Sequence, residues 1–529
     1  MRFPLYAALF SSLAVAAQCG FQQQCSKLAS KLKIENATVW FAEYVAAGTN
    51  LSFPDAHPTC SPGPLTVGVD FCRVALYVAT SSRSGISMEA WLPRNWTGRF
   101  LSTGNGGLNG CLSYDDMAYT VELGFSTVGA NNGHNGTSGT PFLNNPDVVE
   151  DFGWRSVHTN VVVGKEISRE FYGKKHTKSY YLGCSTGGRQ GFKSAQSFPD
   201  DFDGIVAGAP ALDFNNLNSW SGHFYLLTGA PGSPTYLTPE QWTAVHADIM
   251  AQCDGIDGYV DGIIEDPSLC HYRPESLICP STNATNSGTC ITGTQASTVR
   301  AVFSDLYGEN GTLVYPRMQP GSELLGTPYI YYSGNPFQYS ADWFRYAVYN
   351  NPDWDPATLG PADYAASDAL NPADIRTWSG DLSAARERGA KILHWHGLQD
   401  QIITSDNSPR YYAHVARTMG LPPRELDEFY RFFRISGLGH CTGGPGAVFV
   451  GQARDHVASL EPEQNVLMAV VRWVEQGKAP ETILGTAFVN GTASGGEVAF
   501  RRRHCRYPLR NVYTGQGNPK EPGSWKCVV

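Results

Sequence analysis

The chain has 529 residues, enough for two or three domains, and its 42% hydrophobic content is ample for buried cores. The formal net charge is −9 and there is no run of basic residues, so nucleic acid and anionic membranes are not expected as partners. Only 16% of the residues are charged and 56 are glycine, which indicates a compact, loop-rich protein.

The N-terminus matches a secretory signal peptide. Arg2 precedes an apolar run over 5–17, and the small residues at 15–17 suit cleavage after Ala17, so we expect residues 1–17 to be removed. The alternative is a buried N-terminal helix. No later stretch is long and apolar enough to span a membrane. Seven N-x-S/T sequons fit a glycosylated extracellular protein: Asn36, Asn50, Asn95, Asn135, Asn283, Asn310 and Asn490.

Cysteine content also fits an extracellular protein. Thirteen cysteines in a secreted chain predict disulfides, and the odd number leaves one without a partner. Cys19, next to the expected cleavage site, is the best candidate for the odd one. The other twelve can form up to six bridges.

The first 150 residues contain several short strand patterns. Residues 18 to about 80 otherwise show helical and loop patterns. Strands are expected at 74–79, 88–93, 99–102 and 125–129. The third strand runs into a glycine-rich loop, Thr103 to Cys111. Such a loop after an early strand forms half of the oxyanion hole in an α/β-hydrolase, although an ordinary Gly/Asn turn gives the same pattern.

A glycine-flanked serine follows the next predicted strand. After a helix expected over 150–172 and a strand over 179–182, Gly183, Ser185 and Gly187 fit the pattern G-x-S-x-G. In an α/β-hydrolase this pattern is a sharp strand-to-helix turn that holds a nucleophilic serine. A helix to residue 198 and a strand over 204–210 then complete a β-α-β order, which is typical of a parallel sheet.

From about residue 211 to 390 the α/β alternation fades, which predicts an insertion that folds as its own unit. It contains carboxylates at Asp254, Asp257 and Asp261, separated by glycines. Such a loop suits a hard cation that takes six to eight oxygen ligands, with backbone carbonyls completing the shell. The spacing is not that of an EF-hand, and a set of Asp-Gly turns with solvated carboxylates is the alternative.

The strand pattern returns at 391–396, and Asp400 lies in the loop just after it. His394 and His396 could suggest a metal pair, but no third ligand is near, so core or site-wall roles are favoured. A helix is expected over 408–418 and a last strand over 429–435, which ends at His440. The chain order Ser185, Asp400, His440 is the triad order of the α/β-hydrolase fold.

Two cysteines single out His440 among thirteen histidines. Cys184 directly precedes Ser185, and Cys441 directly follows His440. If they pair, their Cα atoms lie about 4.4–6.8 Å apart and Ser185 and His440 become neighbours. Only His271 and His504 also adjoin a cysteine, and both lie away from predicted strand ends.

Together these motifs resemble the fungal feruloyl esterase and tannase family. The resemblance rests on residues 183–191, 397–400 and 439–441, extends to 90–95, 102–107 and 426–433, and is closest to type B feruloyl esterases. It implies an α/β-hydrolase catalytic domain over 18–210 and 391–529, with a lid domain over 211–390 between nucleophile and acid.

The resemblance also implies site residues. The triad would be Ser185, Asp400 and His440. A structural calcium would take the side chains of Asp254, Asp257 and Asp261 and the carbonyls of Tyr259 and Ile263. The disulfides would be Cys25–Cys72, Cys60–Cys111, Cys184–Cys441, Cys253–Cys270, Cys279–Cys290 and Cys505–Cys527, and no organic cofactor is implied.

The expected activity is hydrolysis of aromatic acyl esters by a secreted serine esterase. Ser185 would attack the ester, His440 would take its proton, and the amides of Thr186 and of Gly106 or Gly107 would hold the oxyanion. Expected substrates are hydroxycinnamates such as ferulate, caffeate and p-coumarate, on plant cell-wall polysaccharides or small esters. The alternatives are a tannase acting on galloyl esters, or a non-catalytic glycoprotein that keeps the fold for binding.

Overall fold

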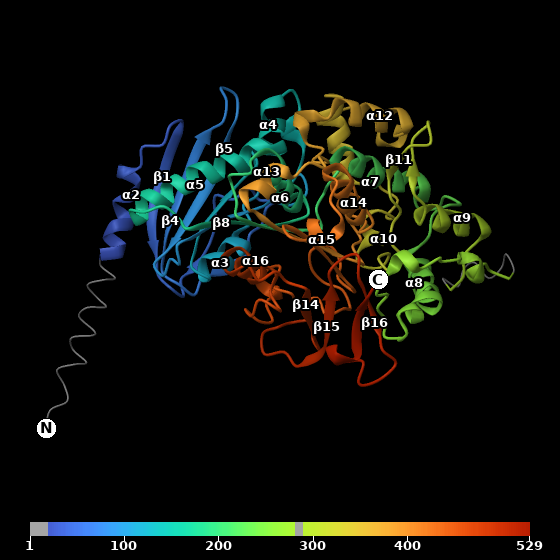
Figure 1. Ribbon diagram of the computed structural model, residues 1–529. Helices are drawn as coiled ribbons and strands as arrows, with labels where there is room; N and C mark the ends of the chain where they lie inside the picture. Colours follow the sequence, from blue (N-terminus) through green and yellow to red (C-terminus); the bar gives the residue numbers. More distant parts are fainter. Residues whose placement is uncertain (1–19, 281–288) are drawn as a thin grey trace.

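The computed structural model describes residues 20–280 and 289–529, and most of the chain is arranged around one large sheet (Figure 1). The expected signal peptide over 1–17, Cys19 and the sequon at Asn283 lie outside the described residues. Helices cover both faces of the sheet, and this mixed α/β architecture agrees with the expected α/β-hydrolase fold.

The sheet has nine strands. Their order is β1 (Ala37–Val45), β4 (Phe71–Ala79), β5 (Gly85–Pro93), β7 (Phe125–Ala130), β6 (Arg99–Thr103), β8 (Lys178–Cys184), β9 (Gly204–Gly208), β12 (Lys391–Gly397) and β13 (Tyr430–Ile435). In this order, the pairs formed by the first four strands, from β1 to β7, are antiparallel. The pairs that follow, from β7 and β6 through to β12 and β13, are parallel. The strands expected from the sequence are present, whereas β1 lies where only helical and loop patterns were expected.

Alternating side chains bury the two faces of this sheet. Tyr181 and Ile205 belong to one hydrophobic core, and their neighbours Tyr180 and Val206 belong to another. Two cores arise because successive side chains of a strand point to opposite faces of the sheet, and amphipathic helices cover each core. The first face packs against α5 (Ser156–Tyr172), α6 (Thr186–Ser197) and α14 (Asn407–Met419), and the second against α3 (Tyr114–Glu122) and α16 (Val466–Gln476).

The helix expected over 150–172 differs in detail. It consists of α4 (Pro146–Glu150), a π-helical turn at Asp151–Arg155, and α5. A π turn adds one residue without breaking the helical course, so the apolar periodicity hardly reveals it.

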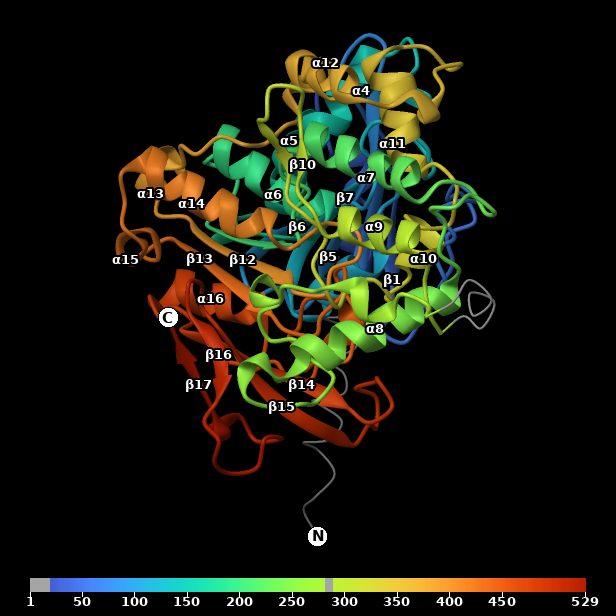
Figure 2. The same ribbon diagram turned by 90° about the vertical axis from the view of Figure 1, so that its right-hand side faces the viewer.

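The segment between β9 and β12 contributes no described strand to the large sheet. It forms α7 (Phe214–Thr228), α8 (Pro239–Cys253), α9 (Gly293–Val302), α10 (Thr327–Ile330), α11 (Gln338–Asp342), α12 (Pro361–Leu370), α13 (Ser383–Arg388) and a hairpin of β10 (Leu306–Tyr307) and β11 (Leu313–Tyr315). In Figures 1 and 2 its green to yellow ribbons gather on one side of the molecule. Its aromatic core, around Trp220, Trp242 and Trp343, also takes in Phe142 and Phe152, so this packing unit extends beyond the expected bounds of 211–390.

The chain ends in two small antiparallel pairs, at the bottom of both views (Figures 1 and 2). They are β14 (Thr482–Phe488) with β15 (Val498–Cys505), and β16 (Arg510–Tyr513) with β17 (Trp525–Val528). Shorter elements are α2 (Leu28–Lys31), β2 (Asn50–Leu51), β3 (Leu65–Thr66) and α15 (Pro423–Leu426). None of the helices described is both long and apolar enough to cross a membrane.

Candidate active site

The candidate catalytic residues all follow parallel strands of the sheet. Ser185 comes directly after β8, Asp400 follows β12, and His440 follows β13. The glycine-rich loop follows β6, the neighbour of β8. Because the carboxyl ends of parallel strands meet at one edge, the fold brings together four segments that are far apart in the sequence.

Ser185 lies in a strained turn between β8 and α6. Its φ of 66° and ψ of −124° are unusual for a residue with a side chain. Its amide donates to the Gly208 carbonyl, and its own carbonyl accepts from the amide of Ala211, both at 3.0 Å. A Cβ placed on Gly104 would lie 2.6 Å from the Cα of Gly187, so the turn packs against the glycine-rich loop without space for a side chain.

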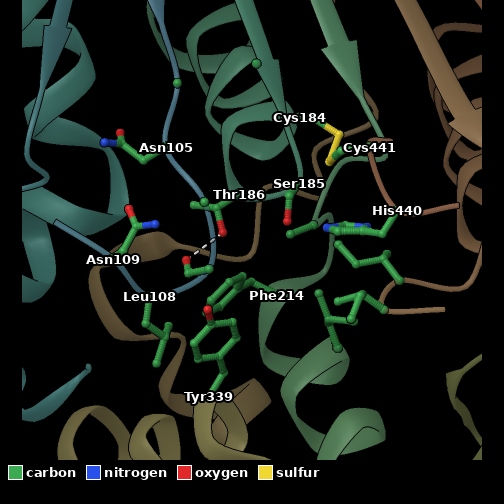
Figure 3. Close-up of a pocket in the computed structure, with 18 of the residues that line it drawn as sticks. Asn105, Leu108, Asn109, Cys184, Ser185, Thr186, Phe214, Tyr339, His440 and Cys441 are labelled. Carbon is green, nitrogen blue, oxygen red and sulfur yellow. Dashed lines mark hydrogen bonds between the residues drawn. A yellow bond between two sulfur atoms is a disulfide. The ribbon is translucent and has the colours of Figure 1, made fainter. Parts of the chain in front are cut away.

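A disulfide joins the serine turn to the histidine loop. The Cα atoms of Cys184 and Cys441 are 6.0 Å apart. Figure 3 shows the Ser185 hydroxyl and the His440 ring pointing toward one another beside this bridge. The structure contains the other five implied disulfides as well.

Asp400 is fully buried and bonded on both oxygens. Its Oδ2 lies 2.8 Å from Nδ1 of His440, and its Oδ1 accepts the amides of Ile402 and Ile403, each at 2.8 Å. Burial alone would raise the pKa of Asp400, but the charge of His440 and hydrogen bonds from His396 and His440 outweigh it and hold that pKa below its ordinary value. An ionised carboxylate at this distance favours a proton on Nδ1 of His440, an arrangement in which Nε2 could accept a proton from a nearby hydroxyl.

The glycine-rich loop offers two amides for an oxyanion. The amide of Gly104 donates to the Leu182 carbonyl, and the amide of Asn105 donates to Oε1 of Gln190, each at 3.0 Å. The amides of Gly104 and Asn105 are therefore already used, and those of Gly106 and Gly107 stay the predicted donors of the loop.

The third candidate amide belongs to Thr186. Thr186 is the first residue of α6, so its amide has no partner within the helix. Its hydroxyl donates to the Gly107 carbonyl at 2.7 Å, drawn as a dashed line in Figure 3, and this bond joins the helix start to the loop.

A cavity of about 430 Å³ opens onto Ser185 and His440. Four aromatic side chains from the segment between β9 and β12 line it: Phe214, Tyr331, Phe337 and Tyr339. Figure 3 shows Phe214 and Tyr339 across the cavity from the serine. The sequence did not single out these four residues, because their positions depend on how the segment packs over the sheet.

Asp116 also lines the cavity, from α3. Burial, together with the charges of Asp115 and Asp455, raises the pKa of Asp116 to about 7. Nothing in the sequence distinguished this aspartate from its neighbours.

The carboxylates of the loop expected to bind calcium accept hydrogen bonds from backbone amides of the same loop. Asp254 accepts the amides of Gly262 and Ile263 at 2.9 and 3.2 Å. Asp257 accepts the Tyr259 amide at 2.9 Å through Oδ1, whereas its buried Oδ2 has no hydrogen-bond partner. That unpaired oxygen is compatible with a cation ligand.

Neighbouring charges shape the same loop. Burial and the carboxylates of Glu265 and Asp261 raise the pKa of Asp257 to about 7. Asp261 is held by Arg502 of β15, 2.7 Å away. Across residues 20–280 and 289–529, no group of three or more His, Cys, Asp or Glu side chains is already arranged as a metal site. Calcium binding stays a prediction, and an ion there would share Asp261 with Arg502, which contacts Oδ2 of that carboxylate.

The six sequon asparagines within the described residues are all exposed: Asn36, Asn50, Asn95, Asn135, Asn310 and Asn490. His394 and His396, in contrast, are completely buried in β12.

Comparison with known proteins identifies the family of the chain. The family model described as "Tannase and feruloyl esterase" matches residues 72–340 and 361–528. The chain is 57% identical over 518 residues to a protein of Aspergillus terreus named "Probable feruloyl esterase B-2", covering 98% of this chain and 97% of that protein.

Two crystal structures of Aspergillus oryzae proteins are also similar. An esterase has a TM-score of 0.94 and 57% identity, and feruloyl esterase B has a TM-score of 0.93 and 53% identity. Each match covers 96% of this chain and 100% of the other. The chain therefore belongs to the tannase and feruloyl esterase family.

Proposed function

We propose that this protein is a secreted serine esterase that releases hydroxycinnamic acids, such as ferulate, caffeate and p-coumarate, from plant cell-wall esters. The observation that carries the proposal is the Asp400–His440 pair, joined at 2.8 Å and tethered through a disulfide to the strained Ser185 turn. Relatives over nearly the whole chain are named feruloyl esterases.

The proposed reaction uses these groups in turn. His440 Nε2 takes the proton of Ser185 as Oγ attacks the acyl carbon, and the Thr186 amide with those of Gly106 or Gly107 binds the oxyanion. The alcohol leaves with the proton from His440. Water, activated by the same imidazole, then attacks the acyl-enzyme and releases the aromatic acid.

The cavity wall favours a hydroxycinnamoyl group over a galloyl group. Three ring hydroxyls of a galloyl ester would require several buried polar partners. In the wall from α7, however, Ser221 Oγ donates to the Leu217 carbonyl at 2.7 Å, and Asn218 Nδ2 donates to the Phe214 carbonyl at 2.9 Å. One donor of each side chain is thus used within the helix, and the rest of that wall is largely aromatic and aliphatic.

The segment over 211–390 acts in this proposal as a lid that supplies the acyl pocket. Its aromatic side chains face Ser185 across the cavity (Figure 3). A calcium ion, if bound, would be held by Asp254, Asp257 and Asp261 with the carbonyls of Tyr259 and Ile263, and would serve to brace the loop between α8 and the C-terminal strands. The exposed sequons and six disulfides support an extracellular location.

The substrate is tested by hydrolysis of methyl ferulate, caffeate, p-coumarate, sinapate and gallate. We expect the hydroxycinnamates to be preferred, and a dominant rate on gallate would assign a tannase instead. A serine-directed phosphonate tests the catalytic claim separately: it should label Ser185 in the folded protein, and absence of labelling would favour a non-catalytic binding protein.

A further inference from the structure

A chain of buried polar side chains lies beneath Asp400 and is not used in the reaction above. His394 and His396 occupy alternate positions of β12, so both point to the same face of the sheet, where α14 places Ser408 between them. All three side chains are at most 1% exposed. Buried imidazoles are costly unless they are hydrogen-bonded, so their partners carry information.

Each hydrogen bond in this series of side chains has a defined donor and acceptor. Nε2 of His396 lies 3.1 Å from Oδ2 of Asp400 and 3.0 Å from the Ile403 carbonyl. An ionised carboxylate and a carbonyl only accept, so Nε2 carries the proton and donates. Nδ1 of His396 must then accept, and Ser408 Oγ donates to it at 2.7 Å.

The bonds farther from Asp400 also donate toward it. Because the Ser408 hydroxyl is used toward His396, its oxygen accepts from Nε2 of His394 at 2.9 Å. Nδ1 of His394 in turn accepts from the hydroxyl of Tyr430 at 2.8 Å. Burial lowers the pKa of His394 well below its usual range, and the nearby His396 lowers it further, so this ring stays neutral.

We propose that His396 is a positioning residue of the triad: it holds Oδ2 of Asp400 in line with His440, and the Ser408–His394–Tyr430 chain fixes its tautomer. The inference rests on the proposed serine esterase mechanism. It goes beyond the triad, because His396 does not line the cavity and touches neither substrate nor reacting atoms.

The reason for such a residue lies in how Oδ2 is otherwise held. The two amide bonds to Asp400 go to Oδ1. Apart from His396, the side chain that Oδ2 contacts is the His440 ring, which gains and loses a proton in each cycle of the proposed reaction. A second, permanent donor keeps the carboxylate from rotating and opposes transfer of the proton from His440 to Asp400.

The test compares two variants that differ in the donor. His396→Phe fills the buried space without an N–H, and His396→Gln restores an N–H near the position of Nε2. We expect kcat on methyl ferulate to fall about 30- to 100-fold in His396→Phe and to recover to within about fivefold of wild type in His396→Gln. KM should change less than about twofold in both, because the residue lies outside the cavity wall. Equal losses of kcat in the two variants, each confirmed as folded, would overturn the proposal.

A second pair covers the case in which His396→Phe does not fold. Ser408→Ala removes the donor to Nδ1 of His396, and we expect kcat to fall about three- to tenfold with KM unchanged. Ser405→Ala is the control. It truncates another buried serine, just before α14, that takes no part in the hydrogen-bonded series from His396 to Tyr430, and it should keep kcat within about twofold of wild type. A Ser408→Ala enzyme with wild-type kcat would contradict the proposal that Ser408 fixes the tautomer of His396.

A readout without substrate separates this inference from the proposed function. The low-field proton NMR signal of His440 Nδ1–H, assigned by its loss in His440→Ala, reports the Asp400–His440 bond. We expect it to shift or broaden in His396→Phe and to return in His396→Gln. An inactive wild type that shows these changes would reject the esterase while keeping the positioning role, and an unchanged signal in His396→Phe would reject the positioning role.

Discussion

A disulfide joins Cys184, the residue before Ser185, to Cys441, the residue after His440, with Cα atoms 6.0 Å apart across 257 positions of sequence. Ser185 and His440 come from different strands, and this covalent link limits their separation. The bridge therefore has two expected effects, one on the stability of the fold and one on the geometry of the reaction.

We expect Cys184→Ala/Cys441→Ala to lose about 2–5 kcal/mol of stability, because a bridge that closes so long a loop restricts the unfolded chain. While the variant remains folded, kcat should fall at least about tenfold, since the base is less well placed. Denaturant unfolding and steady-state kinetics check the two effects. Cys505→Ala/Cys527→Ala serves as control. It removes a bridge between two cysteines that are 22 positions apart in the C-terminal strands, and it should keep kcat. Unchanged turnover in the first variant would make its bridge purely structural.

Gln190 is expected to hold the oxyanion loop in place. Its Oε1 accepts the Asn105 amide at 3.0 Å, and its Nε2 donates to Oδ1 of Asn105 at 3.1 Å. Gln190→Leu should lower kcat about 10- to 100-fold with a smaller effect on KM, since the loop amides act mainly in the transition state. Gln196→Leu, on the same helix but bonded to Tyr411, is the matched control. Equal kinetics for the two variants would show that the loop does not depend on Gln190.

Asp116 should make stability and product binding depend on pH. Its folded-state pKa of about 7 lies above the ordinary 3.8, so folding favours its protonated form. The contribution of the protonated carboxyl to the free energy of unfolding is fully present below about pH 4 and is lost as the pH rises through 7. Asp116→Asn should therefore be about 1–2 kcal/mol more stable than wild type at pH 8, a value discounted for the solvent-accessible cavity, and equal to it at pH 4.

The same residue gives a kinetic readout. Above pH 7 its charge should repel an anionic product, so inhibition by ferulate should weaken in wild type but not in Asp116→Asn. Thermal melts and product inhibition between pH 4 and 8 measure both effects. A difference between the two proteins that does not vary with pH would contradict the assigned titration.

Much of the fold was predictable because buried parallel strands leave strong patterns. The Lys391–Gly397 strand and the Ser185 turn are examples, and adjacent cysteines even linked Ser185 to His440. Strand β1 was missed since it is a half-exposed edge strand, and a register shift between Val39 and Phe41 interrupts its alternation. Edge strands lack the continuous apolar run that marks central ones.

The supporting groups of the site were less predictable. His396 was expected only to have a core or site-wall role, and Gln190 and Asp116 were not singled out, because their roles depend on contacts with distant segments. The cavity aromatics Phe214 and Tyr339 are likewise placed by the packing of α7 and α11. Sequence spacing identifies residues that follow strands, but not which side chains meet across a cavity.

Calcium removal tests the aspartate loop. If the ion binds, elemental analysis should find about one calcium per chain, and a chelator should lower stability by about 2–3 kcal/mol while activity at 25 °C persists. Asp257→Asn should abolish the effect of the chelator, whereas Asp353→Asn, an exposed aspartate of the same segment, should not. A metal-free protein with an unchanged melting temperature in chelator would reject the site.

The most direct test of the account is hydrolysis of methyl ferulate by wild type and Ser185→Ala, each confirmed as folded. We predict steady turnover by wild type and a loss of at least about 10⁴-fold in kcat for Ser185→Ala, because the nucleophile is gone and only transition-state binding remains. Turnover by Ser185→Ala at the wild-type rate would contradict the assignment of Ser185 as the nucleophile.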